Sequence, residues 1–386
     1  MLKNRKSLIK KEIMTNKETY PFDESLKPIE DVTSWEDDHA EVPPTDIVAY
    51  NELRSCADIV RMYKNGQLII QPEFQRDIVW KKAEQTRFID SLIKQLPIPS
   101  MCISLDFNTN ERLVIDGLQR ISTIISFLTN DEYQLSELED VDPKISGKNV
   151  SVIKSKNKTL YERVENLTIP ITVIRCDYEK KSHTEYLFTI FHRLNSGGAK
   201  LNNQEIRNCI YNGKFNAFLK STVKYPNYKK LFNIDDDKSY RFAFEELNLR
   251  YFAFSEKLET YNGRLAKFLN DFMYDKDKNP KLSRITDKEI EEKRKSFQKT
   301  IDLTYIKVFD KKSISTLSKS ITEAVLIGVG KNLNYIDSID VKAANQLFQK
   351  LKNDNLFSID NLKEGLSQKG KVTNRINRSI EIFSGK

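Results

Sequence analysis

The chain of 386 residues carries 63 Lys and Arg against 55 Asp and Glu, a net charge of +8 at pH 7, and 39% of its residues are hydrophobic. Its 21 Phe and 16 Tyr exclude a wholly disordered polymer, and only 12 Gly and 11 Pro exclude a collagen-like chain. No uncharged apolar run approaches the roughly 18 residues that a transmembrane helix needs, and no secretory signal is recognisable. We therefore expect a cytoplasmic protein with no membrane partner.

The positive charge favours a polyanionic or phosphate-bearing partner, although a lysine-rich solvated surface explains it equally well. The four cysteines are far apart and form no CxxC pair, so we expect buried, reduced thiols rather than disulfides or a zinc site. The sequence has only three histidines and no HExxH motif, which excludes a zincin and leaves too few candidates for a nuclease of the His-Asn-His type.

Composition and periodicity divide the chain into three parts. Residues 1–45 are first basic and then acidic with little apolar periodicity, and we interpret them as a flexible charged arm. Residues 181–386 are predicted to be helical almost throughout. The middle part, 46–180, shows helical patterns over 48–64, 83–95 and 118–129, strand patterns over 68–70, 101–105, 112–115 and 170–175, and a polar insertion over 131–166. The expected class is α+β, a small α/β domain followed by an all-α domain.

The sharpest local feature is Asp116-Gly117-Leu118-Gln119-Arg120, where a predicted strand runs directly into a predicted helix. The start of a helix offers unpaired N–H groups and a partial positive charge, and Gly117 allows a ligand to approach closely. Arg120 can fork onto a phosphate, and Asp116 can hold Mg²⁺ or orient a water. The pattern favours a phosphate site, and the alternative is that Asp116 is an N-cap and Arg120 a surface ion pair.

Three further segments present polar side chains at the ends of expected elements. The loop 72–76 follows a short strand, the turn 195–198 ends a helix, and Arg241 begins a long aromatic helix. The alternative for Arg241 is that it is an ordinary charged residue at the rim of that helix. Asn202 and Glu205 have the spacing of a capping box. The candidate residues on these segments and on the helix that Asn202 caps are Gln75, Arg76, Asn195, Gly197, Gly198, Glu205, Arg207 and Arg241.

In this order, the segments resemble the GmrSD-type family, the N-terminal domain of modification-dependent restriction systems, long catalogued as a domain of unknown function. The resemblance covers about residues 46–270. The family has Gln where this chain has Leu118, which is the one clear departure. The matching residues are Pro72, Phe74, Gln75, Arg76, Trp80, Leu96-Pro97-Ile98-Pro99, Asp116, Gly117, Gln119, Arg120, Asn195-Ser196-Gly197-Gly198 and Glu205-Ile206-Arg207.

The resemblance implies a ParB-like domain in which the segment 117–120 binds the phosphates of a nucleoside triphosphate, with Mg²⁺ as cofactor and Asp116 as its ligand. Catalytic roles would fall to Asp116, Arg120 and Arg76. The remaining nucleotide-binding and supporting residues would be Gln75, Gly117, Gln119, Asn195, Gly197, Gly198, Glu205, Arg207 and Arg241.

The prediction for function is a regulator or sensor in bacterial defence against phage or modified DNA, which binds and hydrolyses a nucleoside triphosphate. Its expected partners are a nucleotide, DNA and a separate nuclease or modification subunit. Whether the chain also forms a homo-oligomer stays open. Many members of the family carry a C-terminal nuclease domain that contains histidine, whereas no histidine follows His192 here. Two alternatives stay open, a ParB-like Mg²⁺-dependent DNA nuclease and a non-catalytic DNA- or protein-binding module.

Overall fold

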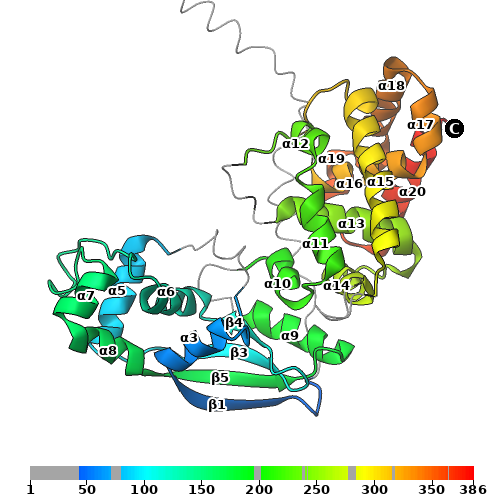
Figure 1. Ribbon diagram of the computed structural model, residues 1–386. Coiled ribbons are helices and arrows are strands. Elements are labelled where there is room, and N and C mark those ends of the chain that lie inside the picture. Colours follow the sequence, from blue (N-terminus) through cyan, green and yellow to red (C-terminus); the bar gives the residue numbers. More distant parts are fainter. Residues whose placement is uncertain are drawn as a thin grey trace, which may run out of the picture. The chain divides into compact units, whose positions relative to one another are not determined.

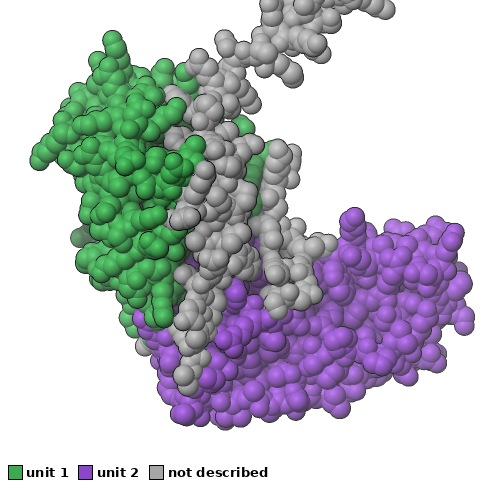
Figure 2. Space-filling view, turned by 180° about the vertical axis from the view of Figure 1, so that it is seen from behind, with its two compact units in different colours: residues 1–38, 212–386 green, residues 39–211 purple. Residues whose placement is uncertain are grey.

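The computed structural model describes residues 43–70, 80–194, 201–236, 240, 242–276, 284–314, 318–363 and 365–386. The chain divides into two compact units between Tyr211 and Asn212, and Figure 2 shows them in different colours. We call residues 39–211 the sheet unit and residues 212–386 the helical unit. The described residues of the helical unit form only helices and loops. The predicted class, a small α/β domain followed by a mostly helical region, is confirmed.

The sheet unit is built on a five-stranded mixed sheet in the order β1-β5-β3-β4-β2 (Figure 1). Strand β5 (Thr168–Cys176) is antiparallel to β1 (Val48–Ser55) and parallel to β3 (Met101–Asp106). Strand β4 (Arg112–Asp116) is antiparallel to β3 and parallel to the short β2 (Leu68–Ile69). Strand β1 is therefore an edge of the sheet.

Successive side chains of β3 point to opposite faces of the sheet, so the two sides of this strand contact different partners. Met101 and Ile103 belong to the main hydrophobic core, to which five of the helices named below, α3, α5, α6, α7 and α8, also contribute. Ser104 points to the other face, where its hydroxyl lies 2.5 Å from that of the buried Tyr178. The helices of this unit are α3 (Cys56–Lys64), α5 (Lys82–Ile93), α6 (Leu118–Thr129), α7 (Val150–Lys156), α8 (Lys158–Asn166), α9 (Lys181–Leu194) and α10 (Asn203–Ile210).

The prediction of one helix over 48–64 is wrong in its first half, because residues 48–55 form strand β1. Its eight residues pair in an unbroken register with β5, from Val48 opposite Arg175 to Ser55 opposite Thr168. The Ser55 hydroxyl then caps α3 by accepting from the Asp58 N–H at 3.0 Å. Leu53 is 68% exposed on this strand. Pairing with a distant strand overrides the local periodicity here.

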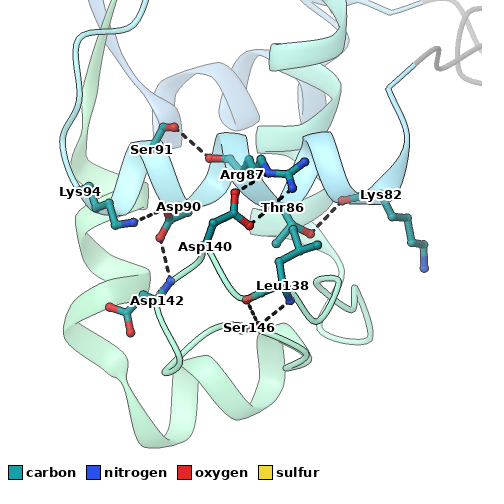
Figure 3. Close-up of polar contacts among 10 residues, drawn as sticks. All are labelled: Lys82, Thr86, Arg87, Asp90, Ser91, Lys94, Leu138, Asp140, Asp142 and Ser146. Carbon is teal, nitrogen blue, oxygen red and sulfur yellow. Dashed lines mark hydrogen bonds and ion pairs between the residues drawn. The ribbon is translucent and has the colours of Figure 1, made fainter.

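The interpretation of 131–166 as a polar insertion is also wrong, because this stretch completes the core of the sheet unit. It contains α7 and α8, and Leu135, Val141 and Ile145 are each at most 3% exposed. Its polar side chains and backbone bind α5 (Figure 3). Asp90 accepts from the Asp142 N–H at 3.2 Å, and Figure 3 also shows the ion pair of Arg87 with Asp140, at 2.7 Å.

The helical unit has an aromatic core in which the rings of Phe252 and Phe297 lie 5.3 Å apart and those of Phe252 and Phe215 5.9 Å apart. Pro226 begins a helix, because Pro is well suited to the first helical turn. No described helix has the length and apolar character needed to cross a membrane. The helices are α11 (Lys214–Thr222), α12 (Pro226–Phe232), α13 (Ala243–Lys257), η2 (Leu258–Thr260), α14 (Leu265–Lys276), α15 (Asp287–Leu303), η3 (Thr304–Val308), α16 (Lys319–Lys331), α17 (Leu333–Ser338), α18 (Val341–Lys352), η4 (Asn355–Phe357), α19 (Ile359–Lys363) and α20 (Lys369–Phe383).

Candidate functional site

The predicted site begins where β4 ends at Asp116 and α6 starts at Leu118. Gly117 is the N-cap residue, with the left-handed φ of 93° that only glycine adopts at little cost. A Cβ on Gly117 would also lie 2.6 Å from Cγ of Met101, which is fully buried in β3. Backbone conformation and packing against Met101 therefore both require glycine at this position.

The start of α6 has no side-chain cap, since its N-cap residue is a glycine. The first backbone bond of the helix runs from the Ile121 N–H to the Gly117 carbonyl oxygen at 2.9 Å. The N–H groups of Leu118, Gln119 and Arg120 have no acceptor among the residues that the structure describes. Three donors at the positive end of a helix are thus left for a ligand or water.

Arg120 joins three pieces of backbone and side chain at this junction. Its Nη2 lies 2.8 Å from Oδ2 of Asp116 and 3.5 Å from the Ser100 carbonyl oxygen, and its Nη1 donates to the Pro99 carbonyl oxygen. The ion pair that we considered as an alternative is present, but it is not a surface pair, because the Arg120 side chain is only 15% exposed. The same alternative took Asp116 as the N-cap of the helix, which is wrong, because the N-cap residue of α6 is Gly117.

Two buried polar atoms lie one turn apart on α6 without a hydrogen-bond partner in the described part of the chain. They are Oε1 of Gln119 and Oγ of Ser122. A buried polar atom that loses its partner costs about 1–3 kcal/mol, so two on one helix face suit a ligand that completes them. Sequence reasoning selected Gln119 but missed Ser122, because a serine inside a helix gives no signal of its own.

The chemistry around Asp116 is limited to one carboxylate. Cys102 is its neighbour in the β3–β4 ladder, and burial raises the pKa of that thiol to about 12, with a smaller contribution from Asp116. Cys102 is therefore no thiolate nucleophile at neutral pH. All four cysteines are buried and free, as predicted. The described residues contain no group of three or more His, Cys, Asp or Glu that could hold a metal by themselves.

A row of polar side chains runs from this junction to the edge of the sheet. The carbonyl oxygen of Ser100 faces Arg120, and its hydroxyl lies 3.2 Å from that of Thr172 in β5. Thr172 in turn donates to Oδ1 of Asn51 in β1 at 2.9 Å. Hydrogen bonds therefore connect the start of α6 with the edge strand β1.

The predicted supporting residues Glu205 and Arg207 lie on α10. The capping box is confirmed, since the Glu205 N–H donates to Oδ1 of Asn202 at 2.8 Å and the Asn202 N–H donates to Oε2 of Glu205 at 2.6 Å. Arg207 is 1% exposed, and its guanidinium lies 5.8 Å from the ring of Phe188 in α9. Helix α10 packs on α9, which contacts β4, the strand that ends at Asp116. These residues thus support the helices that flank the sheet.

The structure brings together Asp116, Gly117, Gln119 and Arg120 at one strand–helix junction. It adds the carbonyl oxygens of Pro99 and Ser100, which sequence reasoning did not find because any residue carries a carbonyl. The other predicted residues lie outside the described residues, namely Gln75, Arg76, Asn195, Gly197, Gly198 and Arg241.

Residues 56–212 match the model of the family described as GmrSD restriction endonuclease, N-terminal domain. The matched range begins at the first residue of α3 and ends one residue beyond the sheet unit. The match suggests a component of a restriction or defence system. Comparisons with curated proteins and with solved structures return no match.

Proposed function

We propose, from the premise that residues 56–212 form an N-terminal domain of the GmrSD family, that this chain binds a nucleoside triphosphate at the start of α6 and hydrolyses it with Mg²⁺. In this role it is a regulator or sensor of a bacterial defence system. The observation that carries the proposal is the set of unpaired donors and acceptors at the first turns of α6, next to Arg120.

The unpaired groups divide into two kinds with different uses. The N–H groups of Leu118, Gln119 and Arg120 are donors, which suit phosphate oxygens at the positive end of a helix. Oε1 of Gln119 can only accept a hydrogen bond, so it suits an attacking water or a ligand hydroxyl rather than a phosphate oxygen. Positioning of this kind supplies most of the catalysis in phosphoryl transfer.

Asp116 fits the part of a Mg²⁺ ligand. It is 38% exposed, and its bond to Arg120 uses Oδ2, which leaves Oδ1 open to other ligands. Mg²⁺ commonly combines one or two carboxylates with waters and phosphate oxygens, so a single aspartate is sufficient when the nucleotide is bound. The metal would neutralise charge on the phosphates, and Arg120 would hold the carboxylate in place.

The proposal includes the candidate residues that lie outside the described part of the chain. Gln75 and Arg76 would form a second phosphate clamp, and Asn195, Gly197 and Gly198 would close the site. The DNA and partner subunit expected from the sequence belong to the same proposal.

A second candidate function is a binding module without turnover. One observation favours it, because the Arg120 guanidinium already has acceptors in Asp116, Pro99 and Ser100. In that case the arginine shapes the junction and leaves phosphates to the helix start alone. A nuclease is favoured less, since the described residues around Asp116 offer one carboxylate where a two-metal site uses several.

We expect Gln119→Ala to separate these functions. The full chain is incubated with each nucleoside triphosphate and Mg²⁺, while phosphate release and nucleotide retention in equilibrium dialysis are measured separately. If Gln119 orients water, release falls about 100-fold while retention is nearly unchanged. A matched control is Ser91→Ala on α5, whose hydroxyl donates to the Arg87 carbonyl oxygen at 2.9 Å. If the parent chain retains nucleotide but releases no phosphate, the binding module is supported. If it neither retains nucleotide nor releases phosphate, both functions are contradicted.

Leu118→Gln introduces the residue that the family pattern has at this position. Leu118 packs against the hydrophobic core of the sheet unit, so its side chain is directed to the interior and not to the unpaired N–H groups. We expect phosphate release within about twofold of the parent and a free energy of unfolding lower by about 1 kcal/mol, because apolar contact is lost. Urea denaturation and the phosphate assay measure the two effects. A large gain in release would show instead that Gln at 118 touches the nucleotide.

A further inference from the structure

The edge strand β1 concentrates exposed apolar side chains. The described residues expose nine large hydrophobic side chains, and three of them, Val48, Tyr50 and Leu53, lie on this strand of eight residues. Leu53 is the most exposed of the nine, at 68%. Because side chains alternate along a strand, Val48 and Tyr50 lie on one face of the sheet and Leu53 on the other, so both faces carry exposed apolar side chains at this edge.

β1 also lacks the features that keep edge strands from pairing. Its register with β5 runs without a bulge over all eight residues, and it contains neither Pro nor Lys. Its two charged residues neutralise each other, since Nε of Arg54 lies 2.8 Å from Oε1 of Glu52. Figure 1 shows β1 at the outside of the sheet, and no described strand pairs with its outer edge.

The end of β1 is chemically self-complementary. The five residues 51–55 read Asn-Glu-Leu-Arg-Ser, so the same five residues in the opposite direction place unlike charges opposite each other. When two copies of this stretch pair antiparallel with Leu53 opposite Leu53, Glu52 of each copy lies opposite Arg54 of the other. Asn51 of each copy likewise lies opposite Ser55 of the other. Opposite charges and apolar pairs directly across two strands are the combinations that stabilise a sheet.

We propose that the outer edge of β1 pairs antiparallel with β1 of a second copy of this chain, with the two Leu53 side chains next to the two-fold axis. The pairing joins two five-stranded sheets into one and covers the most exposed apolar side chain of the described residues. Isologous pairs of this kind are the commonest way for a chain to dimerise. None of the residues proposed to bind the nucleotide lies on β1, so the pairing is expected whether or not the chain hydrolyses a nucleotide.

This register makes a specific prediction for disulfide cross-linking. Directly opposite residues have Cβ atoms about 4.5–5.5 Å apart, so a small shift of the strands reaches the roughly 3.5–4.5 Å of a disulfide, and a Leu53→Cys variant should oxidise to a covalent dimer. The four native cysteines are buried and do not compete. Val48→Cys is the matched control, because Val48 is also exposed, at 52%, but lies outside the paired residues 51–55. We expect dimer to form roughly tenfold or more faster for Leu53→Cys than for Val48→Cys.

A second measurement needs no cysteine. Light scattering of the full-length parent should give a mass that rises toward a dimer with concentration. Leu53→Lys should raise the dimer dissociation constant about tenfold or more, because two like charges would meet at the axis. Circular dichroism checks that this variant is folded, as expected for a side chain that is largely exposed.

Three results would overturn the proposal. The parent could stay monomeric at every concentration, or the two cysteine variants could cross-link at equal rates. The Leu53→Cys thiol could also be protected from maleimide in monomeric protein while the Val48→Cys thiol reacts, which would mean that another segment of the same chain covers the edge.

Discussion

Arg120→Ala is expected to lower phosphate release about 100-fold and the free energy of unfolding by about 2 kcal/mol. The activity falls because Asp116 loses the group that holds it beside the start of α6. The stability falls because the carbonyl oxygens of Pro99 and Ser100 lose their donor. The figure for stability is below that of a fully buried ion pair because Asp116 is 38% exposed. The phosphate assay and urea denaturation test the two parts.

Two further variants give this prediction its controls. Arg120→Lys keeps the positive charge but cannot donate in three directions from a planar fork, so we expect it to recover stability only in part. Arg61→Ala removes an arginine that pairs with Asp58 in α3 at 2.7 Å and is 65% exposed, and it should cost less than about 0.5 kcal/mol. If Arg120→Ala were as stable and active as Arg61→Ala, the junction would not depend on its arginine.

Gly117→Ala is expected to be the most destabilising small substitution at the junction, by about 2–5 kcal/mol. A left-handed backbone costs an alanine roughly 1–2 kcal/mol, and overpacking against Met101 adds roughly 1–3 kcal/mol. Thermal and urea denaturation measure the loss. Nucleotide retention should fall with it, because the start of α6 would have to move.

Gly66→Ala isolates the backbone part of this effect. Gly66 has a φ of 68°, and a Cβ there would meet no atom within 4 Å, so only about 1 kcal/mol should be lost. Adding Met101→Ala to Gly117→Ala removes the contacting side chain and should make the two substitutions cost less together than the sum of their separate costs. Strict additivity would contradict the clash with Met101.

The elements that could be predicted from the sequence are those whose signals are local. Helix α6 has the predicted bounds, because its apolar spacing begins immediately after the Asp-Gly turn. The β3–β4 hairpin and the capping box of Asn202 and Glu205 also follow from neighbouring residues. At the site, Asp116 and Arg120 were predictable as neighbours, since they flank the Asp-Gly turn at which the strand passes into the helix.

The elements that escaped prediction depend on partners far away in the sequence. β1 is a strand because β5, more than a hundred residues later, supplies its hydrogen bonds. The loop before α7 folds onto α5 through backbone N–H groups, which no residue type reveals. The unpartnered atoms of Gln119 and Ser122 likewise exist only once the surroundings of α6 are complete.

The chain of hydrogen bonds through Ser100 has a mechanical consequence. A ligand that attracts the Arg120 guanidinium withdraws a donor from the backbone immediately before β3. The side-chain hydroxyl of Ser100, in this same stretch, is hydrogen-bonded to Thr172. Thr172 in turn donates to the side-chain amide oxygen of Asn51 on the edge strand β1. A ligand bound at the start of α6 would thereby loosen the contacts of β1, and faster amide exchange in β1 would be a measure of its binding.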